Sequence, residues 1–76
     1  MTNAEVSDLL RDAQQFWFQW RDNPPHLADL EMWDYLNKTA LDIANKHGGT
    51  EHVISLMVFF KEELHLRSQE AEHGTK

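Results

Sequence analysis

The chain has 76 residues, carries 7 Lys plus Arg against 13 Asp plus Glu for a formal net charge of -6, and contains no cysteine. The negative charge disfavours direct binding to nucleic-acid phosphates, and the lack of cysteine excludes disulfides and thiolate metal sites. Because no stretch approaches roughly 18 consecutive apolar residues and the N-terminus lacks a signal-peptide pattern, we expect a cytoplasmic protein that does not bind membranes.

The first expected helix begins at Thr2. Thr2 and Glu5 have the spacing of a capping box, in which each side chain bonds to the backbone amide of the other residue. Apolar residues follow at steps of three and four and form one stripe: Val6, Leu9, Leu10, Ala13, Phe16, Trp17 and Trp20. We expect the rings of this stripe to be buried and to compensate for the absence of disulfides in so short a chain.

A second helix is expected from about Pro25 to Lys46. Pro24 and Pro25 end the first helix, and proline is well suited to the first turn of the next one. The apolar residues of this segment again have helical spacing: Leu27, Leu30, Trp33, Leu36, Ala40, Leu41, Ile43 and Ala44. On the outer side, opposite charges four residues apart, such as Asp42 and Lys46, predict a solvated face with Tyr35 at its boundary.

A third helix is expected from about Glu51 to Glu70, after a turn at Gly48 and Gly49. Its tightest apolar stripe has five members: Val53, Leu56, Met57, Phe60 and Leu64. Three amphipathic helices with short connections predict an all-α fold, a small antiparallel three-helix bundle. In this prediction residues 1–70 form a single domain and residues 71–76 form a flexible C-terminal tail.

Three large apolar residues do not fit the predicted core. Phe18 lies about 100° beyond Trp17 around the helix axis, so its ring should be exposed or at the edge of the core. Phe59 and Leu66, seven residues apart, lie well away from the centre of the third stripe. Large exposed apolar surface marks an interface, although a short bundle can also leave single rings half exposed. The candidate partner-binding residues are Phe18, Phe59 and Leu66, with Tyr35, Glu31 and Asp34 as a second surface.

Two groups of residues suggest metal chemistry, and each has a simpler explanation. Glu62 and His65 have a Glu-x-x-His spacing, but they face away from the predicted core stripe. His26, His47 and His52 flank the two connections, where they form either a zinc-binding or pH-sensitive cluster or ordinary helix-end and boundary residues. We expect no metal site in either place.

No catalytic site is expected either. The chain has no cysteine nucleophile, no glycine-rich phosphate loop and no nucleophile motif around its serines. We expect a small non-catalytic interaction or regulatory module without a cofactor, whose aromatic side chains anchor in a partner while its carboxylates set orientation. The partner is either another protein, for which a basic nucleic-acid-binding protein is one candidate, or a second copy of the chain. The alternative is a histidine-based metal- or pH-responsive helical protein.

Overall fold

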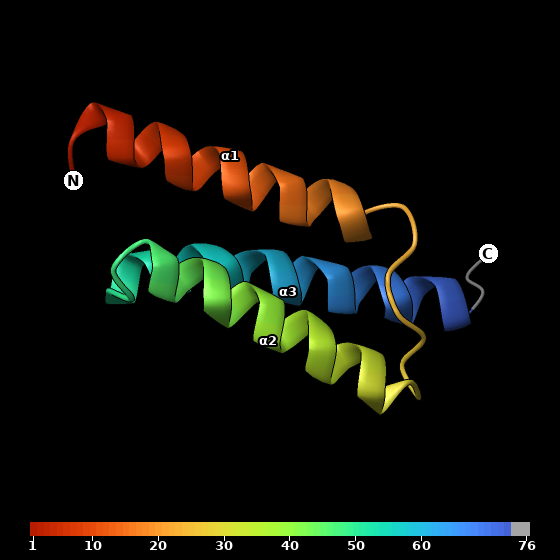
Figure 1. Ribbon diagram of the computed structural model, residues 1–76. Helices are drawn as coiled ribbons and strands as arrows, with labels where there is room; N and C mark the ends of the chain where they lie inside the picture. Colours follow the sequence, from red (N-terminus) through yellow and green to blue (C-terminus); the bar gives the residue numbers. More distant parts are fainter. Residues whose placement is uncertain (74–76) are drawn as a thin grey trace.

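The computed structural model describes residues 1–73, and it contains three helices in this range: α1 (Asn3–Trp20), α2 (Leu30–Lys46) and α3 (Glu51–His73). The helices run in alternating directions and pack side by side into an elongated body of 44 × 23 × 19 Å (Figure 1). Residues 1–73 contain no strand. The predicted all-α antiparallel three-helix bundle is therefore confirmed. Within the same residues, no helix combines the length and the apolar character needed to cross a membrane.

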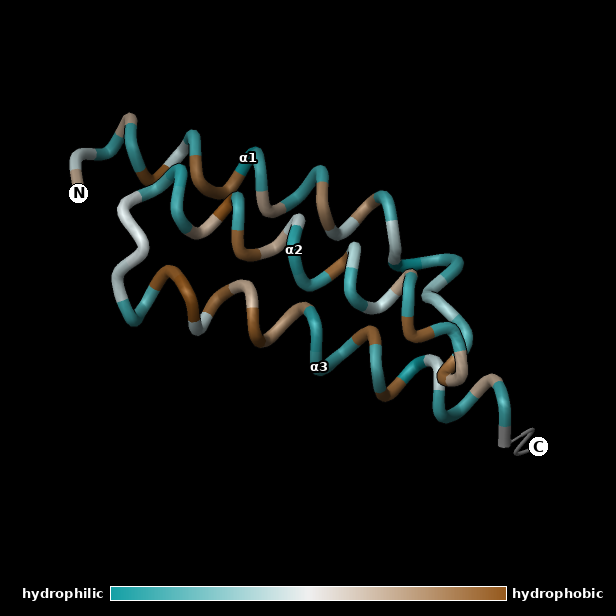
Figure 2. The backbone as a smooth tube through the Cα atoms, turned by 60° about the horizontal axis from the view of Figure 1, so that its bottom comes forward, coloured by the Kyte–Doolittle hydropathy of each residue, from teal (hydrophilic) through white to brown (hydrophobic). Residues whose placement is uncertain are grey.

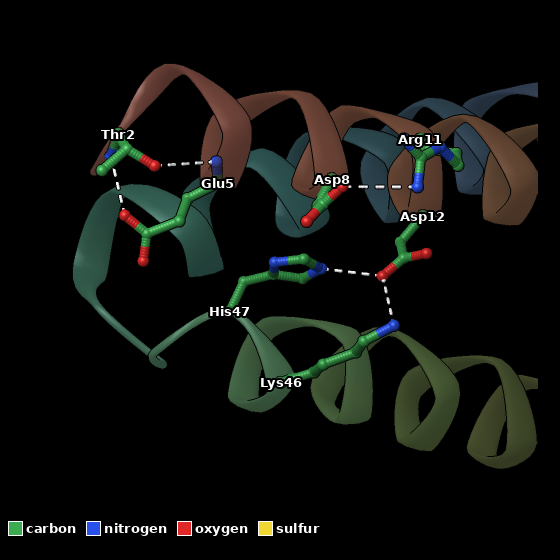
Figure 3. Close-up of polar contacts among 7 residues, drawn as sticks. All are labelled: Thr2, Glu5, Asp8, Arg11, Asp12, Lys46 and His47. Atoms are coloured by element: carbon green, nitrogen blue, oxygen red, sulfur yellow. Dashed lines mark hydrogen bonds and ion pairs between the residues drawn. The ribbon is translucent and has the colours of Figure 1, made fainter.

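The N-terminus of α1 has the predicted capping box. The Thr2 hydroxyl accepts a hydrogen bond from the Glu5 amide at 3.1 Å, and the Glu5 carboxylate accepts one from the Thr2 amide at 2.7 Å (Figure 3). These bonds satisfy two of the amides that a helix start leaves unpaired. The first turn of α1 is thus fixed by residues three apart in the sequence.

The core lies along the line where the three helices meet, and it contains the rings expected there. Its buried residues are Leu9, Ala13, Phe16, Trp20, Leu36, Ala40, Ala44, Val53, Met57 and Leu64. Trp17 and Trp33 are half-buried and pack against this core. Hydrophobic segments recur along all three helices, which agrees with one shared apolar interior (Figure 2).

The predicted stripe of α1 is too wide at its start. Val6 and Leu10 are exposed, although they have the same helical spacing as the buried residues. By helical register both lie on the flank of Trp17, which faces α3 through a ring contact with Phe60 at 5.6 Å. The ring contacts between α1 and α3 on this flank involve Trp17, and the side chains of Val6 and Leu10 remain exposed.

The predicted start of α2 is wrong by about one turn. The helix begins at Leu30, and Asp29 caps it by accepting a hydrogen bond from the Met32 amide at 3.2 Å. Residues 21–29 form a linker that crosses the end of the bundle instead of continuing the helix from Pro25 (Figure 1).

Contacts with α3 explain why the linker is not helical. The buried Ser68 hydroxyl donates a hydrogen bond to the Pro25 carbonyl at 2.7 Å, and the Leu27 amide donates one to the Glu72 carboxylate. In a helix from Pro25 the Asp29 amide would donate to the Pro25 carbonyl, but here it donates to the His26 carbonyl at 2.9 Å and the Pro25 carbonyl bonds Ser68 instead. The long-range partners therefore outweigh the local preference of proline for a first helical turn.

The α2–α3 turn forms as expected, but α3 extends further than predicted. Gly48 and Gly49 have φ angles of 99° and 63°, a left-handed region that side-chain-bearing residues rarely adopt. The third helix then runs to His73, three residues past the expected end at Glu70, so residues 71–73 of the expected tail are helical. Residues 74–76 of that tail lie outside the described part of the chain.

Candidate protein-interaction surfaces

A long groove follows the outer seam between α2 and α3, and we call it the α2–α3 groove. Its larger part is a cavity of about 730 Å³ lined by Leu27, Leu30, Trp33, Asn37, Lys61, Glu62, His65 and Leu66. A narrower part continues along the same seam to Leu41, Ile54 and Val58, and it shares Asn37 and Lys61 with the larger part. Neither part is lined by a residue of α1.

The floor and rim of this groove are mostly apolar. The Trp33 ring meets His65 edge to face at 5.7 Å, and its Nε1 donates a hydrogen bond to the His26 carbonyl at 3.0 Å, which fixes the ring in the floor. Leu30 is 75% exposed and Leu66 is 53% exposed at the rim. Leu41 is also exposed, at the opposite end. The groove is thus an apolar surface that the bundle itself leaves uncovered.

Phe59 and Phe18 are exposed, as expected, but they lie on other parts of the surface. Phe59 is the outer member of a ring series in which it meets Phe60 at 5.6 Å and Phe60 meets Trp17 at 5.6 Å. The Arg67 guanidinium covers the Trp17 ring at 4.6 Å. The Phe18 ring packs beneath the Arg21 guanidinium at 4.8 Å. Neither ring lines the α2–α3 groove: Phe18 lies on α1, and Phe59 lies on the outer side of α3, where helical register places it on the same side as Leu66.

The second expected surface lies on α2. Tyr35 is exposed, and its ring meets the Trp20 ring edge to face at 6.1 Å. Glu31 and Tyr35 line a shallow hollow together with Asp29 and Met32. Asp34 is exposed but does not line this hollow. Phe59 and Leu66 thus share the outer face of α3, Phe18 lies on α1, and the other three candidates lie on α2, so the structure does not bring all six together into one site.

The three connection histidines do not form a cluster. His26 lies in the linker with its Nδ1 at 3.4 Å from the Glu72 carboxylate, at the opposite end of the bundle from the other two (Figure 1). His52 Nδ1 lies 3.1 Å from the Thr50 hydroxyl. His47 points toward α1. Among the described residues, no three His, Cys, Asp or Glu side chains are placed to hold a metal ion.

His47 instead joins a polar cluster with Asp12 and Lys46, shown in Figure 3. The same Asp12 oxygen lies 2.7 Å from His47 Nε2 and 2.8 Å from Lys46 Nζ, and the His47 side chain is only 8% exposed. The Lys46 ammonium, and next the His47 ring, hold the pKa of Asp12 below its ordinary value. The cluster therefore ties α1 to the end of α2 by charged hydrogen bonds.

The sequence pattern did not predict this cluster. Asp12 belongs to the polar side of the predicted first helix, and Lys46 was expected to pair with Asp42, four residues earlier. The partners of Asp12 lie 34 and 35 residues away, so helical spacing carries no signal for them. In the structure Lys46 pairs with Asp12 instead of Asp42.

Comparisons with known proteins supply no relative for the chain. No family model, curated protein or solved structure matches it. Any assignment of function rests on the surfaces described above.

Proposed function

We propose that this protein is a small cytoplasmic, non-catalytic module that binds other protein surfaces. The observation that carries the proposal is the α2–α3 groove, where exposed leucines and an isoleucine from both helices gather on either side of Asn37 and Lys61. Exposed apolar side chains that gather in one groove, rather than lying singly over the surface, are typical of interaction sites. The module would act by binding to a surface of its partner and covering it.

The aromatic and acidic candidates provide further contacts in this proposal. Phe18 on α1 and Phe59 on α3 offer two exposed rings, and rings are enriched among the residues that dominate binding energy. Tyr35 with Glu31 and Asp34 offers a mixed aromatic and acidic surface on α2. Because the net charge is -6, these outer faces favour basic protein surfaces over nucleic acids.

Capture from the native host with two immobilised baits tests the proposal. One bait is the unaltered chain, and the other carries Leu30→Ser with Leu66→Ser, which removes exposed apolar groups without opening the core. Leu10→Ser is the matched control, because Leu10 is 55% exposed like Leu66 but lies on α1. We expect specific retention of a protein, or of the chain itself, by the unaltered and control baits alone. Identical protein sets on all three baits, together with no self-association, would contradict the proposal.

The alternative function, a pH- or metal-responsive protein, has one observation in its favour. His47 is a nearly buried histidine in direct contact with Asp12, and histidine is the side chain that most readily changes charge near neutral pH. Thermal unfolding with and without stoichiometric zinc, across about pH 5 to 8, separates the two functions. A rise in Tm with zinc would favour the alternative, and indifference to zinc would favour the binding module.

A further inference from the structure

We infer that the α2–α3 groove is closed by the same groove of a second copy of the chain, in a two-fold symmetric dimer in which Lys61 of each copy faces Glu62 of the other. The inference rests on the proposed function, because it names the partner for the surface that carries that function. Both the apolar and the charged residues of the groove support a second copy of the chain as the partner that covers it.

The shape of the groove suits a second pair of helices. From Leu30 to Leu41 it follows α2 for 11 residues, which is about 16 Å or three helical turns. Figures 1 and 2 both draw α1 on one side of the α2–α3 pair, and no residue of α1 lines the groove. Because α2 and α3 are antiparallel, a two-fold axis across the groove would pack them against their copies as four helices around one apolar seam.

The charges of the groove are self-complementary. Lys61 and Glu62 are its charged lining residues, so the groove is formally neutral while the chain carries a net charge of -6. Two copies can therefore approach through this face with less repulsion than through a face that is negative overall. A basic helix from a foreign protein would find one carboxylate balanced by one ammonium, and thus little net attraction.

Lys61 and Glu62 are also available for pairing between copies. Among the described residues, neither side chain forms an ion pair within its own chain, whereas Arg67 and Lys46 both do. A symmetric interface uses the same patch on both copies, so a contact between residue i and residue j occurs twice. Adjacent opposite charges at the middle of the groove meet this requirement, because each Lys61 can face Glu62 of the other copy.

Sedimentation velocity of the full chain, from low to high micromolar concentration at physiological salt, tests the inference. We expect the unaltered chain to shift with concentration toward twice its mass of 9.0 kDa. Lys61→Glu alone and Glu62→Lys alone should each weaken self-association at least about tenfold, since each places like charges opposite one another. An equal mixture of the two variants should restore dimers, because one chain then carries two negative and the other two positive groups.

Several controls make the result decisive. Leu30→Ser should weaken the dimer and Leu10→Ser should not, and circular dichroism melts of all variants show whether they remain folded. If a charge variant unfolds, the comparison of these two leucine variants decides, because both side chains are already exposed in the monomer. A dimer that Leu30→Ser leaves unchanged overturns the groove as the interface. A chain that stays monomeric but retains another protein through Leu30 and Leu66 overturns the second copy as occupant and leaves the binding module intact.

Discussion

Replacing Trp20 by phenylalanine separates two contributions to stability: the gain from apolar burial of the ring and the cost of a buried N–H group without a hydrogen bond. The Trp20 ring is only 7% exposed, and its Nε1 is buried without a hydrogen-bond partner among the described residues. Trp33 is the matched comparison, since it is half-buried and its Nε1 donates to the His26 carbonyl at 3.0 Å. The same substitution at both positions removes a ring nitrogen that has no partner in one case and a partner in the other.

The expected magnitudes follow from burial and hydrogen bonding. Trp20→Phe loses about 2 kcal/mol of apolar burial, at roughly 0.8 kcal/mol per CH₂ equivalent. It also removes an unpaired buried N–H, which costs about 1 to 3 kcal/mol in the native protein. The two effects nearly cancel, so we expect the free energy of unfolding to change by no more than about 1 kcal/mol. Trp33→Phe loses about 1 kcal/mol of burial and a further 0.5 to 1.5 kcal/mol of hydrogen bonding, so it should destabilise by roughly 2 kcal/mol.

Urea unfolding followed by far-ultraviolet circular dichroism measures both changes, because the substitutions themselves alter tryptophan fluorescence. Equal denaturant slopes would show that both variants unfold from comparably compact states. Burial alone predicts the opposite order, with the larger loss at the more buried Trp20. A cost for Trp20→Phe that exceeds both about 2 kcal/mol and the cost of Trp33→Phe would refute the reasoning.

Two further changes test the polar contacts that join distant parts of the chain. The depressed pKa of Asp12, caused chiefly by Lys46, means that its carboxylate contributes stability above the unfolded-state pKa of about 3.9, and that this contribution is lost as pH falls through the lower folded-state pKa. Chemical unfolding between about pH 5 and 2 should therefore show a larger loss for the unaltered chain than for Asp12→Asn, and parallel curves would contradict this. Ser68→Ala leaves the Pro25 carbonyl without its buried donor and should cost about 1 to 2 kcal/mol, a fall in Tm of roughly 4 to 16 °C. The exposed Ser7→Ala is its control, and equal melting of both variants would show that the hydroxyl contributes nothing.

The parts of the fold that were predicted correctly depend on residues close together in the sequence. The capping box of Thr2 and Glu5 involves residues three apart, and the glycine turn occupies two adjacent positions. The burial of Phe16 and Trp20 follows from a helical period that spans four residues. Such features need no knowledge of how the helices meet, so the sequence contains enough information to predict them.

The parts that were missed depend on contacts between distant residues. Ser68 and Glu72 bond the linker from 43 and 45 residues away, and this moves the start of α2 from Pro25 to Leu30. Among the candidate site residues, the exposure of Leu66 was predicted from its angle to the stripe of its own helix. Leu30 and Leu41 were predicted to belong to the core stripe of α2, but both are exposed. Helical spacing shows which residues share a face of one helix, and it does not show which of them the neighbouring helices cover.

The position of the linker also determines part of the proposed binding surface. Because the chain does not become helical until Leu30, this residue lies in the first turn of α2 at the rim of the groove, and Leu27 lines the same cavity from the linker. The bonds from Ser68 and Glu72 hold that arrangement, although Ser68 does not line the groove. If the linker shapes the interface, Ser68→Ala should weaken self-association under conditions where the variant is still fully folded, while Ser7→Ala should not. A destabilised Ser68→Ala variant that dimerises as tightly as the unaltered chain would show that the groove depends on α2 and α3 alone.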